Sequence, residues 1–183
     1  VSGDVTVISG PTAVGKGTVV QALRALHPEL WVSVSATTRA PRPGEVDGQH
    51  YLFVSEAEFD ELIASDGLLE WALVHGTDRY GTPAAPVRAA VAAGRRVILE
   101  IEVQGARQVK QRLPEVRTVF IAPPSFDALR ERLAARGTET PAQVARRLRT
   151  AEGELAVAAE FDHVVVNDDL GAAVGQLVEL LGL

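Results

Sequence analysis

Cysteine and methionine are both absent from this chain of 183 residues. Without cysteine, the chain forms no disulfide and offers no thiolate to a metal ion. No apolar run approaches the roughly 18–20 residues that a membrane-spanning helix needs. No basic flank followed by an apolar stretch opens the sequence, so we expect no signal peptide. The chain length fits one folding unit, since domains hold about 100–200 residues, and a cytoplasmic location fits the lack of cysteine.

Lysine is scarce, and the net charge is −6. The chain has two lysines, Lys16 and Lys110, beside sixteen arginines. No basic stripe stands out, so we do not expect nucleic acid as a partner. An anionic small molecule fits this charge balance where a few arginines gather locally. The four histidines show no metal-ligand spacing, and we interpret them as surface or packing residues: His27, His50, His75 and His163.

The stretch VTVISGPTAVGKGT, residues 5–18, joins a strand pattern to a helix pattern. Val5–Ile8 is a short β-branched run, as in a buried strand, and from Val19 the apolar residues recur at helical spacing. A glycine loop between them, followed at once by Lys16, is the setting of a phosphate-binding loop. Backbone amides would surround an anion, and Lys16 would reach the β and γ phosphates of a nucleotide. The alternative is a plain turn that connects strand to helix.

The loop departs at one position from the usual GxxxxGK[ST] pattern. Gly17 stands where a serine or threonine normally binds Mg²⁺. Thr18 is the nearest hydroxyl, so we expect it to serve as the metal ligand, directly or through water. The loop residues expected to bind ATP are Gly10, Pro11, Thr12, Ala13, Val14, Gly15, Lys16, Gly17 and Thr18.

Strand and helix patterns alternate along most of the chain, which predicts a parallel sheet covered on both faces. The section 35–91 breaks this alternation and predicts an inserted lobe. Ligands of such sheets bind at the C-terminal ends of the strands, where the glycine loop, Ser35 and Glu102 are expected. We predict a turn-rich loop over 75–83 and a helix from Ser55, with Glu58 completing a capping box. The predicted strands include Trp31–Ala36, Leu68–Val74, Val97–Val103, Val116–Ile121 and His163–Val166.

A second informative stretch is SATTRAPRPGEVDGQHY, residues 35–51. It brings Arg39 and Arg42 near Tyr51 in the sequence. Arginine grips phosphate oxygens with two parallel hydrogen bonds, and a tyrosine hydroxyl adds a neutral donor. A second phosphate site is what a two-substrate phosphoryl-transfer enzyme needs. The alternative is a solvated loop that carries incidental arginines.

These motifs, followed in order by LLEWA, RYGTP, IEVQGA, IAPPS, ARGTET and VVNDD, resemble the guanylate kinase family over essentially the whole chain. The resemblance implies an α/β fold: a three-layer P-loop fold with a parallel central sheet, an inserted mixed α/β lobe for GMP, and a helical lid. The implied parts are a core of residues 1–34, 94–125 and 155–183, a GMP-binding lobe of residues 35–93, and a lid of residues 126–154.

The resemblance also assigns roles to single residues. Phosphate of GMP would be held by Arg39, Arg42, Tyr51 and Tyr80. Guanine would be recognised by Ser35, Glu70 and Thr82, because a carboxylate accepts from the N1–H and 2-amino groups, a donor pair that adenine lacks. Transfer itself would depend on Lys16, Arg39 and the lid residues Arg132, Arg136 and Arg147. Asn167 would lie near the adenine of ATP, and Mg²⁺ would accompany ATP.

Two further departures concern Glu102, where the family usually has aspartate, and Arg79, which replaces the first of a tyrosine pair. Glu102 would contact GMP or a metal-bound water. The implied activity is phosphorylation of GMP, and of dGMP, by direct in-line transfer from ATP. Three alternatives stay open: a kinase for another monophosphate, favoured by a GKGT ending that resembles adenylate kinase; a non-catalytic interaction module; and a general P-loop ATPase.

Overall fold

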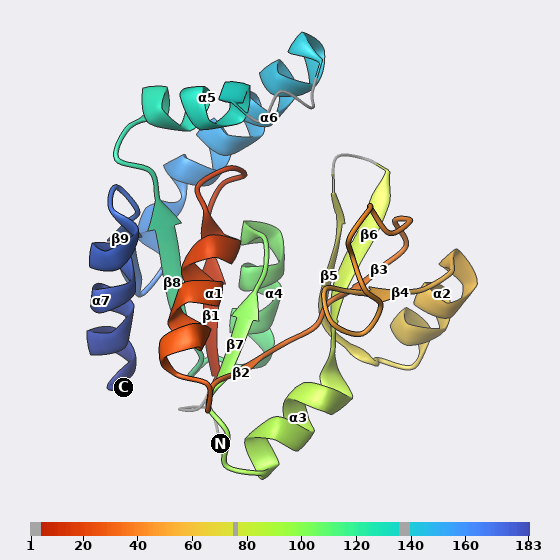
Figure 1. Ribbon diagram of the computed structural model, residues 1–183. Helices are drawn as coiled ribbons and strands as arrows, with labels where there is room; N and C mark the ends of the chain where they lie inside the picture. Colours follow the sequence, from red (N-terminus) through yellow and green to blue (C-terminus); the bar gives the residue numbers. More distant parts are fainter. Residues whose placement is uncertain (1–4, 75–76, 136–139) are drawn as a thin grey trace. The chain divides into compact units, whose positions relative to one another are not determined.

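The computed structural model describes residues 5–74, 77–135 and 140–183 (Figure 1). Strands and helices alternate along most of the chain. The strands are β1 (Val5–Ser9), β2 (Trp31–Val32), β3 (Ala36–Thr37), β4 (Leu52–Phe53), β5 (Leu68–Val74), β6 (Asp78–Pro83), β7 (Val97–Glu100), β8 (Arg117–Ala122) and β9 (His163–Val166). The α-helices are α1 (Lys16–Leu26), α2 (Glu56–Ala64), α3 (Ala84–Ala92), α4 (Val103–Arg112), α5 (Phe126–Ala135), α6 (Pro141–Ala156) and α7 (Leu170–Leu181).

Five strands form a sheet in the order β2-β7-β1-β8-β9. The pairs β2–β7 and β8–β9 are parallel, so the expected α/β architecture with a parallel sheet is confirmed. β1 is buried along its whole length, as its β-branched sequence predicts. A second sheet, in the order β4-β3-β6-β5, is mixed: β3 runs parallel to β4 and antiparallel to β6, and β5 is antiparallel to β6.

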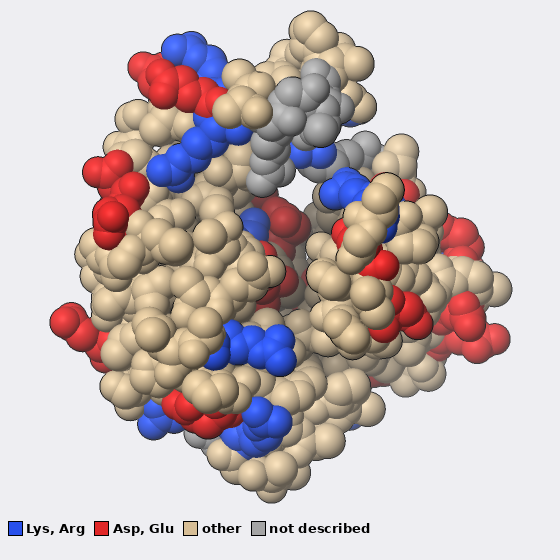
Figure 2. Space-filling view, in the orientation of Figure 1, with Lys and Arg blue, Asp and Glu red and all other residues tan. Residues whose placement is uncertain are grey.

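The chain divides into two compact units. Unit 1 comprises Val1–Thr6, Leu30–Leu99 and Gln104–Val116. Unit 2 comprises Val7–Glu29, Glu100–Val103 and Arg117–Leu183. On the face shown in Figure 2, acidic and basic side chains are interspersed over the surface. No helix of the described segments is long and apolar enough to cross a membrane.

Unit 1 holds the mixed sheet, with helix α2 packed beside it. Phe59 of α2 is fully buried together with Ala36 and Leu68. The predicted capping box at the start of α2 is confirmed, because the Ser55 hydroxyl accepts from the Glu58 amide and the Glu58 carboxylate accepts from the Ser55 amide. These local bonds fix where the helix begins and direct its apolar face onto the sheet.

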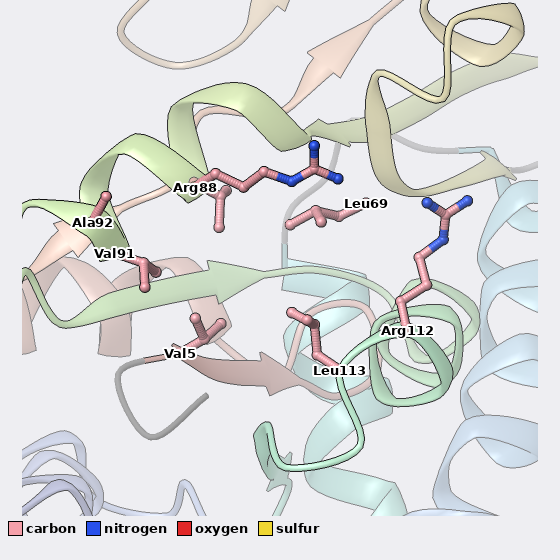
Figure 3. A pocket seen from close by; sticks show the side chains of 8 residues that line it. Val5, Leu69, Arg88, Val91, Ala92, Arg112 and Leu113 are labelled. Atoms are coloured by element: carbon pink, nitrogen blue, oxygen red, sulfur yellow. The ribbon is translucent and has the colours of Figure 1, made fainter. Parts of the chain in front are cut away.

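An apolar cavity of about 630 Å³ lies in unit 1 (Figure 3). Two guanidinium groups, those of Arg88 and Arg112, line it, and Arg112 is paired with Asp66 at 2.8 Å. The other lining residues are apolar: Val5, Leu69, Val87, Val91, Ala92 and Leu113. None of these residues belongs to the site predicted from sequence.

Unit 2 contains β8, β9 and the helices α1, α5, α6 and α7, and α1 packs against α7. Helix α6 begins with a capping box between Thr140 and Gln143. Asp162, just before β9, accepts hydrogen bonds from the backbone amide and the hydroxyl of Thr118 in β8, at 2.8 and 2.9 Å. This pair holds the neighbouring parallel strands in register.

Three sequence predictions were wrong: the two strands predicted over 31–36 and 97–103, and the loop predicted over 75–83. The strand predicted over 31–36 is two short strands, β2 and β3, that belong to different sheets. The strand predicted over 97–103 ends at Glu100, and Val103 already begins α4, so Glu102 lies in the connection between them.

The loop predicted over 75–83 contains β6, although its residues 75–76 lie outside the described part of the chain. The sequence of β6 has low strand propensity, but its pairing with β5 overrides that preference. Gly81 is needed there, because an added Cβ would lie 2.9 Å from the carbonyl oxygen of Glu70.

Candidate active site

The glycine loop lies between β1 and α1, in the setting that the sequence predicts. Gly10 has φ of 146°, and a Cβ on it would overlap the carbonyl oxygen of Ile121 in β8. Gly15 has φ of 92°, in the left-handed region, and immediately precedes α1. Both positions therefore require glycine, and the loop closes tightly over the end of the sheet.

Lys16 is the first residue of α1, and its side chain is only 10% exposed. Its ammonium group donates to the carbonyl oxygen of Gly10, at the other end of the loop. It also lies 3.4 Å from the Glu102 carboxylate. The lysine is thus held across the loop, where the first-turn amides of α1 add positive potential for an anion.

Two more carboxylates surround Lys16. Burial, opposed by the charge of Lys16, raises the pKa of Glu100. The pKa of Glu154, on α6, is raised to about 7 by burial and by the charge and hydrogen bond of Glu102. Sequence reasoning assigned no role to Glu100 at the end of β7, and it missed Glu154 because only folding brings α6 to the loop. Burial, with the charge of Glu102 adding to it, raises the pKa of Glu154 enough to keep a proton on this carboxyl near neutral pH.

The carbonyl oxygen of Val14, inside the glycine loop, is bound by two predicted site residues. Asn167 donates to it through Nδ2 at 2.8 Å, and Arg132 through Nη1 at 3.3 Å. Arg132 also donates to the carbonyl oxygen of Asn167 at 2.9 Å. The structure therefore brings Asn167 and Arg132 to the glycine loop.

The two other predicted lid arginines are Arg147 and Arg136. Arg147 lies half-buried on α6. Arg136 lies outside the described residues, so the shared helical face expected for Arg132 and Arg136 stays a prediction.

In unit 1, Arg39 lies at the centre of an aromatic and acidic cluster. Its Nε donates to the hydroxyl of Tyr80 at 2.9 Å, and its guanidinium carbon lies 5.3 Å from the ring centroid of Tyr51. Its Nη1 and Nη2 donate to the two carboxylate oxygens of Glu45 at 3.0 and 2.9 Å. This paired hydrogen bond raises the pKa of Arg39 and lowers that of Glu45.

Arg42 belongs to the same cluster through its backbone. Its amide donates to Glu45 Oε2 at 2.7 Å, and its carbonyl accepts from the Glu45 amide at 3.0 Å. The Arg42 side chain is exposed. Sequence reasoning missed Glu45; the signal was its place three residues after Arg42, behind a Pro-Gly turn.

Glu70 and Thr82 form a buried polar pair on adjacent strands. They are directly opposite in the β5–β6 register, and the Thr82 hydroxyl donates to Glu70 Oε1 at 2.6 Å. Glu70 is 5% exposed and Thr82 is fully buried. A carboxylate at such a depth is costly, which points to a binding role rather than to packing. Ser35 lies just before β3, which pairs with β6.

Arg79, which departs from the tyrosine pair of the family, has a structural explanation. Its guanidinium pairs with Asp60 at 2.6 Å and with Glu56, both on α2, and lies 4.8 Å from the ring centroid of Phe59. Arg79 therefore ties β6 to α2, and its side chain is engaged away from Arg39 and Tyr80.

A parallel sheet whose first strand leads through a glycine loop and a lysine into a helix defines a P-loop nucleotide-binding protein. A crystal structure of shikimate kinase from Bacteroides thetaiotaomicron shares this fold, with a TM-score of 0.53 at 17% identity over 98% of both chains. A crystal structure of guanylate kinase from Anaplasma phagocytophilum superposes with a TM-score of 0.78 at 30% identity, covering 97% of this chain and 83% of that one.

The sequence comparisons are more specific. The sequence model described as "Guanylate kinase" matches residues 2–182. A guanylate kinase from Nocardia farcinica is 60% identical over 97% of this chain and 93% of its own length, and one from a Synechococcus species is 53% identical over the same shares. The chain belongs to the guanylate kinase family, and it is a nucleotide-binding enzyme of the kinase class.

Proposed function

We propose that this enzyme transfers the γ-phosphoryl group of ATP to GMP, giving ADP and GDP, and that it also accepts dGMP. The observation that supports the proposal is the presence, in one member of this family, of two clusters with a cationic side chain that could bind an anion. One is the glycine loop with Lys16; the other is the arginine cluster around Arg39. A P-loop ATPase would need only the first. The proposal includes a cytoplasmic location and no nucleic-acid or membrane partner.

The ATP side of the site is assigned to unit 2. Amides of the glycine loop, residues 10–18, surround the phosphates, and Lys16 neutralises the β and γ groups. Arg132, Arg136 and Arg147 screen the charge that develops as the phosphoryl group moves. Asn167, whose amide nitrogen is bound to the Val14 carbonyl, lies at the adenine end of ATP.

The GMP side is assigned to unit 1. Arg39, Tyr51 and Tyr80 form the phosphate site together with the exposed side chain of Arg42. Guanine is recognised by Ser35, Glu70 and Thr82. Adenine lacks the N1–H and 2-amino donors, so it would donate no hydrogen bond from these positions to the buried Glu70 carboxylate, and this is the basis of selection.

We also assign Mg²⁺ as the ion that accompanies ATP. The oxygen ligands that unit 2 offers fit Mg²⁺. Thr18 offers a hydroxyl in the first turn of α1, and the Glu100 carboxylate lies 3.5 Å from the point where a Cβ on Gly17 would stand. Mg²⁺ is commonly held by one or two carboxylates together with substrate phosphates and waters. When bound, it neutralises phosphate charge. Glu102 would contact GMP or a metal-bound water.

The chemistry needs little from the protein beyond alignment and charge. An oxygen of the GMP phosphate attacks the γ-phosphorus in line, the bond to the β-phosphate oxygen of ATP breaks, and ADP leaves with that oxygen. The monophosphate is already an anion, so no strong base is required. Lys16 and the arginines offset repulsion between the two anions. In this scheme residues 35–93 are the GMP-binding lobe, residues 126–154 are the lid, and the remaining residues are the core.

The test is ADP release from ATP measured with GMP, dGMP, AMP, CMP and UMP in turn. We expect turnover with GMP and dGMP, and faster turnover of AMP than of GMP would overturn the substrate assignment. The Lys16→Ala variant should lose about 10²–10³-fold in kcat while it still binds GMP. A folded, GMP-binding wild-type protein that forms no GDP would support the interaction-module alternative instead.

A further inference from the structure

Gly105 lies in the first turn of α4 and is buried against the side chain of Glu70. A Cβ added to Gly105 would lie 2.9 Å from Glu70 Cδ and 3.3 Å from Cγ, and it would overlap Oε2. The backbone of Gly105 is not in the left-handed region that favours glycine. Space, rather than backbone conformation, therefore explains the glycine at this position.

The other oxygen of the same carboxylate is fixed by Thr82. Its hydroxyl donates to Oε1 at 2.6 Å across the β5–β6 ladder. One oxygen is thus held by a hydrogen bond, and the other occupies the space that a Cβ on Gly105 would need. Since Glu70 is 5% exposed, the carboxylate has little free space in which to rotate.

We propose that Gly105 is a specificity-determining positioning residue, which sets the orientation of the Glu70 carboxylate toward the base of the monophosphate substrate. This inference rests on the proposed function, in which Glu70 reads guanine. Gly105 touches neither the base nor the reacting phosphates; it acts through Glu70 alone. The substrates it favours are monophosphates of 6-oxopurines that carry a 2-amino group.

A comparison of GMP with IMP as substrates measures the orientation of the Glu70 carboxylate. IMP has the same 6-oxo group and N1–H as GMP but lacks the 2-amino group. A correctly oriented carboxylate accepts from both donors of guanine and from only one donor of hypoxanthine. A carboxylate pushed aside by a methyl group at position 105 loses the second contact, so GMP suffers more than IMP.

The experiment compares Gly105→Ala with wild type, using kcat and KM for GMP, IMP and ATP. We expect kcat/KM for GMP to fall by about tenfold or more, mainly through KM, because about 1.4 kcal/mol of contact corresponds to tenfold. The ratio of GMP to IMP efficiency should fall at least threefold, and KM for ATP should not change. Gly175→Ala is the matched control, since Gly175 lies in α7 with no atom within 4 Å of an added Cβ. An unchanged GMP-to-IMP ratio in Gly105→Ala would overturn the proposal.

A second arm uses Glu70→Asp, which shortens the side chain by one methylene and withdraws the carboxylate from the added methyl group. The double variant Gly105→Ala/Glu70→Asp should lose less GMP efficiency than the two single losses combined, and additive losses would overturn the proposal. Should Gly105→Ala fail to fold, as judged by circular dichroism, restored folding in the double variant supports the inference and continued unfolding overturns it. Wild-type protein that does not phosphorylate GMP would instead refute the proposed function.

Discussion

Both carboxylate oxygens of Glu45 accept hydrogen bonds from the guanidinium of Arg39, at 3.0 and 2.9 Å. The same carboxylate also accepts from the backbone amide of Arg42 at 2.7 Å. One acidic side chain therefore holds the guanidinium of Arg39 and the backbone of Arg42, two arginines that are separated by Ala40 and Pro41. Such preorganisation reduces the entropy that a phosphate ligand must remove when it binds.

Replacing Glu45 by alanine should therefore weaken GMP binding, even though it removes a negative charge. We expect a loss of about tenfold in GMP affinity, the scale of one charge-assisted hydrogen bond. Isothermal titration calorimetry with GMP measures it. Glu179→Ala, which removes an exposed acid from α7, is the control for net charge. Tighter GMP binding by Glu45→Ala would mean that Glu45 competes with the phosphate.

Arg42→Ala tests the phosphate role of the exposed arginine. Loss of a charge-assisted contact should weaken GMP binding by about 1.5–3 kcal/mol. Arg24→Ala, which removes an exposed guanidinium from the last turn of α1, should leave GMP affinity as it is. Equal GMP affinity in Arg42→Ala and wild type would remove Arg42 from the phosphate site.

The missing hydroxyl at position 17 leads to a gain-of-function prediction. Gly17→Ser should lower the Mg²⁺ concentration needed for half-maximal turnover, because it adds a ligand where the loop pattern normally has one. There is room for the serine, since the added Cβ would lie 3.5 Å from Glu100 Oε1.

Thr18→Ala should raise the Mg²⁺ concentration needed for half-maximal turnover, and it should lower turnover more than GMP affinity. Direct titration of Mn²⁺ with ATP present, followed by electron paramagnetic resonance, reads metal binding apart from turnover. No change in either variant would show that the metal is held elsewhere.

Glu154 makes stability depend on pH. Its pKa rises from 4.5 to about 7 on folding, chiefly through burial. The folded state therefore holds the proton more tightly, so this contribution to stability is present in full below pH 4.5 and is lost as the pH rises through about 7. A shift of this size corresponds to about 3 kcal/mol, which partial exposure reduces to about 1–2 kcal/mol.

The variant Glu154→Gln has no carboxyl group to titrate at this position, so it should not lose this stability as the pH rises. We expect its melting temperature to match wild type near pH 5 and to exceed it at pH 8. Thermal melts across this range measure the difference. Burial also raises the pKa of Glu100, but this affects both proteins alike, so the difference between them isolates Glu154. Parallel pH profiles of the two proteins would contradict the assignment.

Local signals were sufficient for the parts of the fold that depend on neighbours in sequence. The strand, glycine loop and helix of residues 5–26 follow from adjacent residues, and so does the capping box of Ser55 and Glu58. Strand β6 was missed because its stability comes from pairing with β5 and not from its own residues.

The same limit applies to the candidate site. Glycine-loop residues were recognised because one short motif contains them. Glu154 was not, because a helix far along the chain carries it to Lys16. Gly105 was missed for a different reason: its role is the absence of a side chain beside Glu70, which only packing reveals.

The carbonyl of Val14 is bound by Arg132 and Asn167, which lie far toward the C-terminus. A ribosome-bound nascent chain therefore contains the residues of the strand and the loop early, but it gains Arg132 late in synthesis and Asn167 later still. Premature stop codons between Thr18 and Asn167 should leave products that retain the loop residues yet hold ATP poorly. Such fragments would not draw on the nucleotide pool while they await degradation.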